Sequence, residues 1–183
     1  MSDLFEQLKD KITPAKKKIL FPESLDERVL QAAAKLSKDG VLIPVLIGNV
    51  DAIKEKAASL GIDVSDCVTV DPENYPGYDE MVQAFVERRK GKATEEQARE
   101  ILQNPNYFGT MLVYQGEADG LVSGAVHSTS DTVRPALQLI KTKPGVKKTS
   151  GVFIMVRDDE KYVFADCAIN IAPDAADLAE IAQ

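Results

Sequence analysis

The stretch of residues 118–140, ADGLVSGAVHSTSDTVRPALQLI, concentrates the side chains of this chain that could do chemistry. It holds the only histidine, an arginine and a group of hydroxyl side chains. These are His127, Arg134, Ser128, Thr129, Ser130 and Thr132. Arginine is a bidentate partner for phosphate or carboxylate oxygens, and hydroxyls add further donors. Together these residue types favour a site for a phosphorylated small molecule.

The position of this stretch points to the same chemistry. Residues Gly120–Ser123 read as a buried strand that runs through a turn into a helix. Open α/β sheets bind ligands where a strand ends and a helix begins. Backbone N–H groups that are free there, and the positive end of the helix dipole, favour anions. We therefore expect a phosphate cradle at this junction.

A purely structural interpretation fits the same residues. Ser128-x-x-Asp131 resembles a variant of the capping box, and Pro135 is best tolerated in the first turn of a helix. His127 on its own is more simply a hydrogen-bonded loop histidine than a base. The residue types alone leave the helix cap and the anion site both open.

Composition excludes several classes of function. The 183 residues carry a formal net charge of −7, whereas a nucleic-acid binder needs a basic face. The two cysteines, Cys67 and Cys167, do not form a CxxC motif or a Cys/His cluster, so we expect no metal site. No apolar run reaches the roughly 20 residues that span a bilayer. We expect a cytoplasmic protein with no membrane partner and with reduced thiols.

The first part of the chain alternates strands and helices. Helical spacing of apolar residues predicts an opening helix that stops before Pro14, and a second helix closed by Gly40. Strands are predicted at Lys18–Pro22, Val41–Ile47 and Val68–Val70. The second helix is expected to carry its apolar face on Leu25, Val29, Ala32, Ala33 and Leu36, and a third to run through Ile53, Ala57 and Leu60. This order predicts a three-layer α/β domain, a parallel sheet with helices on both faces.

The middle of the chain is predicted to be helical, over Tyr78–Arg89, from Thr94 to Leu102, and over Pro105–Tyr114. The first of these helices ends in the basic run 88–92, RRKGK. Such a run is either a solvated helix end or a dock for a phosphate-bearing cofactor.

The character of the chain changes after residue 141. The sequence Lys143-Pro144-Gly145 breaks the chain, and two strands, Gly151–Val156 and Tyr162–Ala165, are predicted to form a hairpin. A helix is predicted over Asp174–Ala182. We expect residues 1–145 to be a first α/β domain that lacks its C-terminal return segment. Residues 146–183 are expected to begin a second α/β domain.

Four long strings resemble the phosphate acetyl/butyryltransferase family, and in particular its phosphate acetyltransferases. They are LFPESLDERVLQAA near the start, residues 85–98, residues 106–146 and residues 163–182. The resemblance covers essentially the whole chain. It implies reversible transfer of acetyl between coenzyme A and orthophosphate, in acetate metabolism. It also implies two α/β domains with a cleft between them, related to isocitrate and isopropylmalate dehydrogenases, and a homodimer. Acetyl-CoA, phosphate and acetyl phosphate would be its small-molecule substrates, with no tightly bound cofactor.

The resemblance assigns roles to particular residues. Arg88 or Arg89, with a preference for Arg88, and Arg134 match positions linked to coenzyme A binding. Arg134 and Ser128 are the candidate catalytic residues within this chain. The remaining candidates for substrate contact are Thr129, Thr132 and Cys167, the last as a non-nucleophilic neighbour of coenzyme A.

The family segment that carries the general base lies beyond residue 183. The chain therefore resembles an N-terminal portion and is expected to be inactive alone. A phosphate butyryltransferase, another acyl-phosphate transferase of the same fold, and a non-catalytic interaction or regulatory module remain alternatives.

Overall fold

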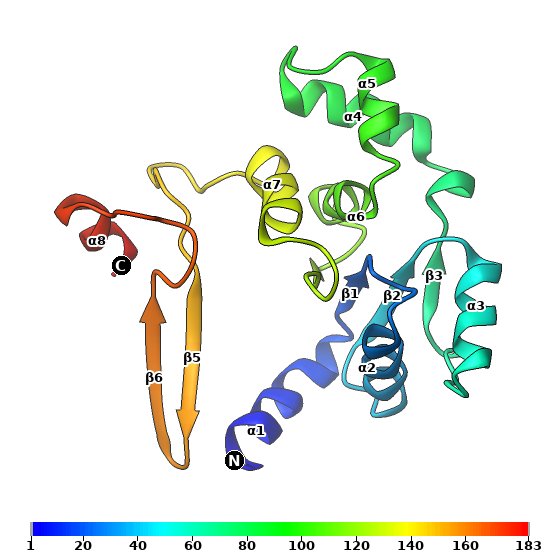
Figure 1. The fold of residues 1–183 in the computed structure, drawn as a ribbon, viewed down its shortest axis with the longest axis horizontal. Helices are drawn as coiled ribbons and strands as arrows, with labels where there is room; N and C mark the ends of the chain where they lie inside the picture. Colours follow the sequence, from blue (N-terminus) through cyan, green and yellow to red (C-terminus); the bar gives the residue numbers. More distant parts are fainter. Residues whose placement is uncertain (1, 183) are drawn as a thin grey trace. The chain divides into compact units, whose positions relative to one another are not determined.

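The computed structural model describes residues 2–182 and separates into two compact units (Figure 1). The larger unit spans residues Lys9–Ile140. The smaller unit combines residues 2–8 with residues 141–182. Helix α1 (Ser2–Ile12) and the short 3₁₀ helix η1 (Thr13–Ala15) open the chain, with α1 stopping before Pro14 as predicted.

The larger unit is built on a four-stranded parallel sheet in the order β3-β2-β1-β4. Its strands are β1 (Lys18–Phe21), β2 (Ile43–Ile47), β3 (Val68–Val70) and β4 (Gly120–Leu121). Strand β1 is central, with Leu20 opposite Val45 of β2 and Leu121 of β4.

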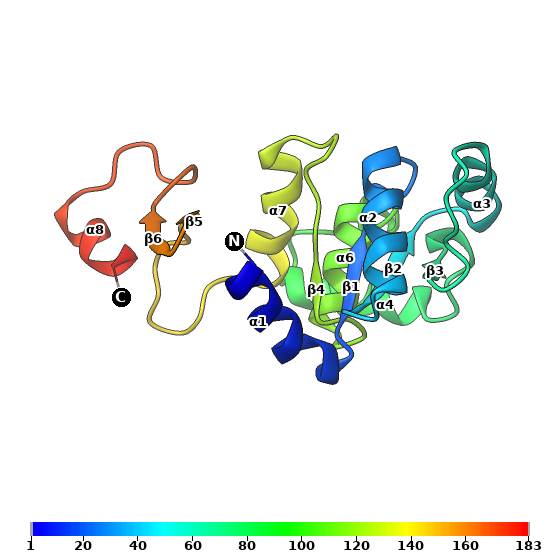
Figure 2. The same ribbon diagram turned by 90° about the horizontal axis from the view of Figure 1, so that it is seen from below.

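Helices cover both faces of this sheet (Figure 2). Successive residues of a strand point to opposite faces, so Phe21 packs with helices α2 (Glu27–Lys38) and α3 (Val50–Ser59). Leu20 packs on the other face, with the helices that follow β3. Those helices are α4 (Tyr78–Arg89), α5 (Glu95–Ile101), α6 (Pro105–Tyr114) and α7 (Thr129–Leu139), reached through the 3₁₀ helix η2 (Pro72–Asn74). The prediction of a three-layer α/β domain is confirmed for this unit.

The start of α2 and the start of β2 both differ from the predicted boundaries. Leu25 was expected on the buried face of the second helix, but it precedes α2 and is 54% exposed. The Asp26 carboxylate accepts the N–H of Arg28 and so fixes the helix start at Glu27. Val41 still belongs to the helix end, because its N–H donates to the carbonyl of Leu36, and β2 therefore begins at Ile43.

The expected position of Pro135 was wrong. Ser128 is the N-cap of α7, so the helix begins at Thr129 and Pro135 is its seventh residue. Proline has no N–H to donate to the carbonyl of Asp131, four residues earlier. The buried Pro135 ring packs on the same side of α7 as the buried Leu139. The strand before this helix is also shorter than predicted, since β4 ends at Leu121 rather than at Ser123.

Helix α6 approaches the sheet more closely than a side chain would allow at Gly109. A Cβ atom at this position would lie 2.6 Å from Cδ1 of Leu121 and 2.8 Å from Cδ1 of Ile47. Both distances are shorter than real contacts of a Cβ atom. The absence of a side chain therefore sets the distance between α6 and strands β2 and β4.

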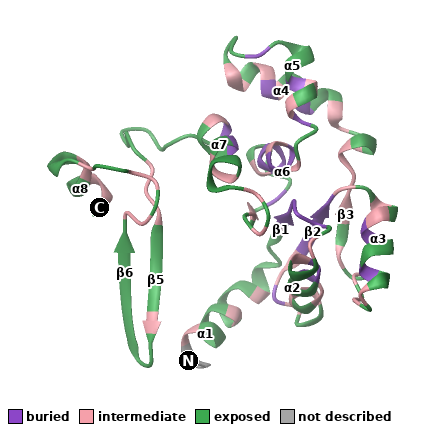
Figure 3. Ribbon diagram, in the orientation of Figure 1, coloured by how far each residue is buried: buried purple, intermediate pink, exposed green. Residues whose placement is uncertain are grey.

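The smaller unit contains the predicted hairpin, β5 (Val152–Arg157) and β6 (Glu160–Ala165), and helix α8 (Ala175–Ile181). Apolar side chains stand on both faces of the hairpin, and Figure 3 shows it as almost entirely exposed. Ile154 is 67% exposed, and Phe153, its neighbour on the opposite face, is 57% exposed. A ribbon that is apolar on both faces is typical of strands inside a larger sheet.

No helix in the described part of the chain is both long and apolar enough to cross a membrane.

We predict that Gly109→Val lowers the free energy of unfolding by about 1–3 kcal/mol, because the added side chain forces α6 away from the sheet. Chemical denaturation followed by circular dichroism measures this loss. Ala58→Val is the matched control on the exposed side of α3 and should cost less than about 1 kcal/mol. Equal effects of the two substitutions would contradict the close approach at Gly109.

Candidate functional site

The loops that follow β1 and β4 meet beyond the carboxyl ends of these two parallel strands. These strands are neighbours, but the chain leaves β1 toward β2 on one side and reaches β4 from β3 on the other. Such a reversal of strand order is the topological switch point at which open α/β sheets bind ligands. The candidate residues of the 118–140 stretch follow β4 directly in the chain, so they lie next to this switch point.

The carboxylate of Glu23 occupies this junction. Its Oε2 accepts the backbone N–H groups of Gly124 and Ala125 at 3.0 and 2.8 Å. Its Oε1 accepts those of Val126 and His127 at 2.9 and 2.8 Å. The expectation of free N–H groups for an external anion at this turn was therefore wrong. Four successive donors are bonded to a carboxylate of the chain itself, whose side chain is only 2% exposed.

This environment keeps Glu23 ionised. Burial raises the pKa of its carboxyl, but the N–H groups of Val126, His127 and Ala125 outweigh burial and bring the pKa down to about 2. Nδ1 of His127 lies 2.8 Å from Oε1 of Glu23. Facing an ionised carboxylate, Nδ1 carries the proton and donates it to the hydrogen bond. His127 is thus the hydrogen-bonded loop histidine of the simpler interpretation.

The hydroxyl groups that follow form the first turn of α7. The Ser128 Oγ accepts the N–H of Asp131 at 3.2 Å and donates to the Asp131 carboxylate at 2.7 Å. The Thr132 hydroxyl donates to the carbonyl of Ser128 at 3.1 Å. Thr129 is exposed at the start of the helix. The predicted cap is therefore present, made by the side chains of Ser128 and Asp131.

The two arginines at the end of α4 have different surroundings. Arg88 donates from Nε to the carbonyl of Leu139 and from Nη2 to that of Ile140, the latter at 2.8 Å. Its guanidinium also lies 4.9 Å from the centre of the Tyr114 ring. The last carbonyls of a helix have no partners inside that helix. Arg88, the arginine preferred from the sequence, therefore holds the C-terminal end of α7.

Arg89 and Arg134 both lie near enough to Tyr107 for their charges to act on its hydroxyl. The Nε of Arg89 is buried and has no hydrogen-bond partner among residues 2–182. Burial raises the pKa of the Tyr107 hydroxyl, and the charges of Arg134 and Arg89 both act on it in the opposite direction. Tyr107 donates to Oε1 of Gln138 at 3.0 Å, and Arg134 donates from Nη2 to the Ser130 hydroxyl at 2.8 Å. We call Arg89, Tyr107 and Arg134 the arginine cluster.

Cys167 belongs to the smaller unit, where its Sγ donates to the carbonyl of Phe164 at 3.0 Å. The carboxylate of the neighbouring Asp166 is bonded to the backbone N–H groups of Gly151 and Asn170, which hold the pKa of Asp166 far below its usual range. The other predicted site residues all lie in the larger unit.

Sequence reasoning missed Glu23 and Tyr107. The signal for Glu23 was an acid two residues after a buried strand, in the string LFPES. Tyr107 stands in an apolar helix and gives no comparable signal. In the described part of the chain, no group of three or more His, Cys, Asp or Glu side chains is placed to hold a metal ion.

We predict that Glu23→Gln lowers the free energy of unfolding by about 3 kcal/mol at pH 7, because the amide cannot accept from all the donors. The pKa of Glu23 is lower in the folded chain than in the unfolded one. Its contribution is therefore complete above about pH 5 and is lost as the pH falls toward 2. Urea denaturation at pH 7 and pH 3 should show the difference between variant and parent shrinking with acidification. Glu55→Gln, an exposed control on α3, should leave the free energy of unfolding unchanged at both pH values.

Comparisons with known proteins agree on one family. The family model described as "Phosphate acetyl/butaryl transferase" matches residues 3–183. A phosphate acetyltransferase of Bacillus subtilis (strain 168) is 64% identical over 182 residues, which are 100% of this chain and 56% of the relative. One from Staphylococcus epidermidis (strain ATCC 12228 / FDA PCI 1200) is 58% identical over 182 residues, which are 100% of this chain and 55% of the relative.

Solved structures give the same result. The EutD phosphotransacetylase from Staphylococcus aureus matches with a TM-score of 0.93 and 55% identity, over 99% of this chain and 55% of that one. A phosphotransacetylase from Streptococcus pyogenes matches with a TM-score of 0.94 and 54% identity, over 100% of this chain and 56% of that one. The chain spans about half the length of the curated relatives it matches. It belongs to the phosphate acetyl/butaryl transferase family.

Proposed function

We propose that this chain is the N-terminal portion of an enzyme that transfers acetyl reversibly between coenzyme A and orthophosphate, with acetyl phosphate as the second product. Membership of the family and the names of its relatives support this activity. The observation that carries the proposal is the arginine cluster. The charges of Arg89 and Arg134 both act on the Tyr107 hydroxyl, and the buried Nε of Arg89 has no hydrogen-bond partner in the described part of the chain.

The cluster suits the binding of coenzyme A. Coenzyme A and phosphate are both polyanions, so cationic donors must hold them together against their mutual repulsion. Arg89 takes the place of Arg88 in this role, because Arg88 is engaged with the end of α7. Arg134 is exposed on the second turn of α7 and can reach an anion from there.

The hydroxyl groups at the start of α7 complete the proposed site. Arg134 and Ser128 act on the reacting groups as donors to the oxyanion that develops on acyl transfer, and Ser128 does so by turning its hydroxyl proton away from the Asp131 carboxylate. Thr129 and Thr132 contribute contacts to phosphate. A thiol needs a positioned base to become a nucleophile, and we assign that base to the part of the enzyme that this chain does not span.

The smaller unit is proposed to begin a second α/β domain, with the boundary near residue 145 and a fold like that of isocitrate and isopropylmalate dehydrogenases. Its exposed hairpin would then lie inside a larger sheet. We further propose a cytoplasmic homodimer in acetate metabolism, with coenzyme A as a substrate and no tightly bound cofactor. Because the family description names both acyl groups, butyryl transfer is the second candidate activity.

We predict that Arg89→Gln and Arg134→Gln each raise the dissociation constant for coenzyme A about 10- to 100-fold, since each removes a charge-assisted contact. Their melting temperatures should stay within a few degrees of the parent. Isothermal titration calorimetry on the 183-residue chain at millimolar coenzyme A measures the first quantity. Lys90→Gln, in the same basic run, is the matched control for binding.

Substitution of the neighbouring Arg88 should change the stability of the fold rather than the affinity for coenzyme A. Arg88→Gln removes two bonds to the carbonyls of α7 and the contact with Tyr114, so it should lower the melting temperature clearly. Normal coenzyme A binding by Arg89→Gln, or full stability of Arg88→Gln, would contradict this division of roles.

Cys167 is proposed to lie near bound coenzyme A without acting as a nucleophile. Its thiol makes one weak bond to a carbonyl, so Cys167→Ala should retain most of the acetyltransferase activity of the full-length enzyme. Thiol release from acetyl-CoA and phosphate measures this activity, with Cys67→Ala as control. Complete loss in the Cys167 variant would point to a covalent acetyl-enzyme instead.

A further inference from the structure

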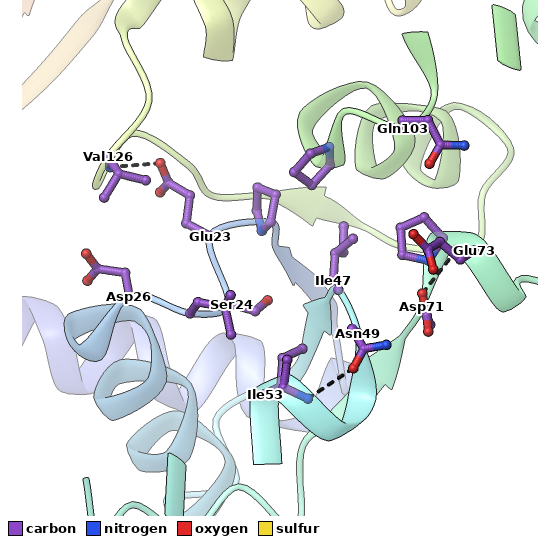
Figure 4. A pocket seen from close by; sticks show the side chains of 16 residues that line it. Glu23, Ser24, Asp26, Ile47, Asn49, Ile53, Asp71, Glu73, Gln103 and Val126 are labelled. Atoms are coloured by element: carbon purple, nitrogen blue, oxygen red, sulfur yellow. Dashed lines mark hydrogen bonds between the residues drawn. The ribbon is translucent and has the colours of Figure 1, made fainter. Parts of the chain in front are cut away.

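A cavity of about 550 Å³ opens at the carboxyl ends of β1, β2 and β3 (Figure 4). It lies wholly within the larger unit, and neither the arginine cluster nor any site residue predicted from the sequence lines it. Small molecules bind in cavities of about 300–1,000 Å³, and in open α/β sheets they do so beyond the carboxyl ends of the strands. The proposed function leaves this cavity unused.

The charge of the lining limits what the cavity can hold. Four carboxylate side chains line it, and no lysine or arginine does. The four are Glu23, Asp26, Asp71 and Glu73. Phosphate or carboxylate groups of a ligand would meet repulsion here, because no cationic side chain lines the cavity and the guanidinium of Arg28 is already paired with Asp26. The cavity therefore favours an uncharged ligand over an anionic one.

Most of these carboxylates already have partners. Glu23 is bonded to the 124–127 loop, and Asp26 to Arg28. Asp71 accepts the N–H of Glu73 and the side-chain amide of Asn74. The Glu73 carboxylate accepts no hydrogen bond from another described residue and is exposed. Glu73 is thus the acceptor that the cavity offers to a ligand.

Two amide side chains provide further hydrogen-bonding groups. Asn49 accepts the N–H of Ala52 through Oδ1, which leaves its NH₂ group for a ligand. Gln103 donates from Nε2 to the Tyr78 hydroxyl, which leaves its Oε1 as an acceptor. In Figure 4, Gln103 lies on the same side of the cavity as Asp71 and Glu73, with Asn49 between them and Asp26. One donor and one acceptor are therefore available to a ligand that carries both.

The remaining walls are apolar and rigid. They come from the buried Ile47 and Ile53, three prolines and a valine, which are Pro22, Pro72, Pro105 and Val126. Proline rings and β-branched side chains have few accessible torsion angles, so they form apolar surfaces with little freedom to move. Such walls suit a planar ring.

We propose that this cavity binds a nucleoside that carries no phosphate. The Glu73 carboxylate accepts from the ribose hydroxyls, as an acidic side chain does in dinucleotide-binding sheets. The amides of Asn49 and Gln103 offer a donor and an acceptor to the edge of the base, which lies between the apolar walls. The site requires neither Arg89 nor Arg134, so it stands independently of the proposed acyl transfer.

Calorimetric titration of the 183-residue chain with adenosine tests this site. We expect a dissociation constant of about 1 mM or below. Ala52→Phe, which fills the cavity from α3, should abolish binding, and Glu73→Gln should weaken it about 10-fold. Ala58→Phe on the exposed side of α3 and Glu55→Gln are the matched controls and should bind as the parent does. A thermal melt of each variant establishes that it is folded.

Adenosine monophosphate distinguishes the nucleoside from a nucleotide or from the adenosine part of coenzyme A. We expect it to bind at least 10-fold more weakly than adenosine at low salt, because its phosphate meets the carboxylates. No binding of adenosine at 10 mM, tighter binding of the monophosphate, or unchanged binding by folded Ala52→Phe would each overturn the proposal.

Discussion

The arrangement of this molecule depends on one buried carboxylate. Glu23 follows β1 and accepts four successive N–H groups from the loop that follows β4, 101 to 104 residues later in the chain. With a pKa of about 2, it is ionised and remains an acceptor at neutral pH. These four hydrogen bonds join the loops that follow β1 and β4 at the topological switch point of the sheet. They thereby fix where α7 begins and the direction in which the following side chains emerge.

The same interaction explains why the proposed function assigns anion binding to side chains. A loop of aligned N–H groups is a ready anion site, but in this chain the site holds an internal anion. External anions must then be recognised by guanidinium groups. Helix α7 is secured at both ends, by the Ser128 cap at its start and by Arg88 at its last carbonyls. Between these ends it carries Arg134, whose charge acts on the Tyr107 hydroxyl together with that of Arg89.

Local signals in the sequence predicted most of the elements. The helix start at Thr94, the break at Pro14 and the Gly40 helix end depend on neighbouring residues, and each was found where expected. Arg88 and Arg89 show why the rest was not predictable. They are adjacent and chemically identical, yet they lie about 100° apart around one helix. Only the packing of α4 on α7 decides which one meets the carbonyls of Leu139 and Ile140.

The attachment of α7 by Arg88 has a consequence for heat inactivation. Helix ends open more readily than the centre of a parallel sheet, and they do so without unfolding the whole domain. If the end of α7 opens, Arg134 moves away from Arg89 while β1 and β2 remain paired. Ligand affinity would then fall at temperatures at which far-ultraviolet circular dichroism still reports a folded protein. The thermal limit of the proposed site would then be set by a helix end rather than by the core.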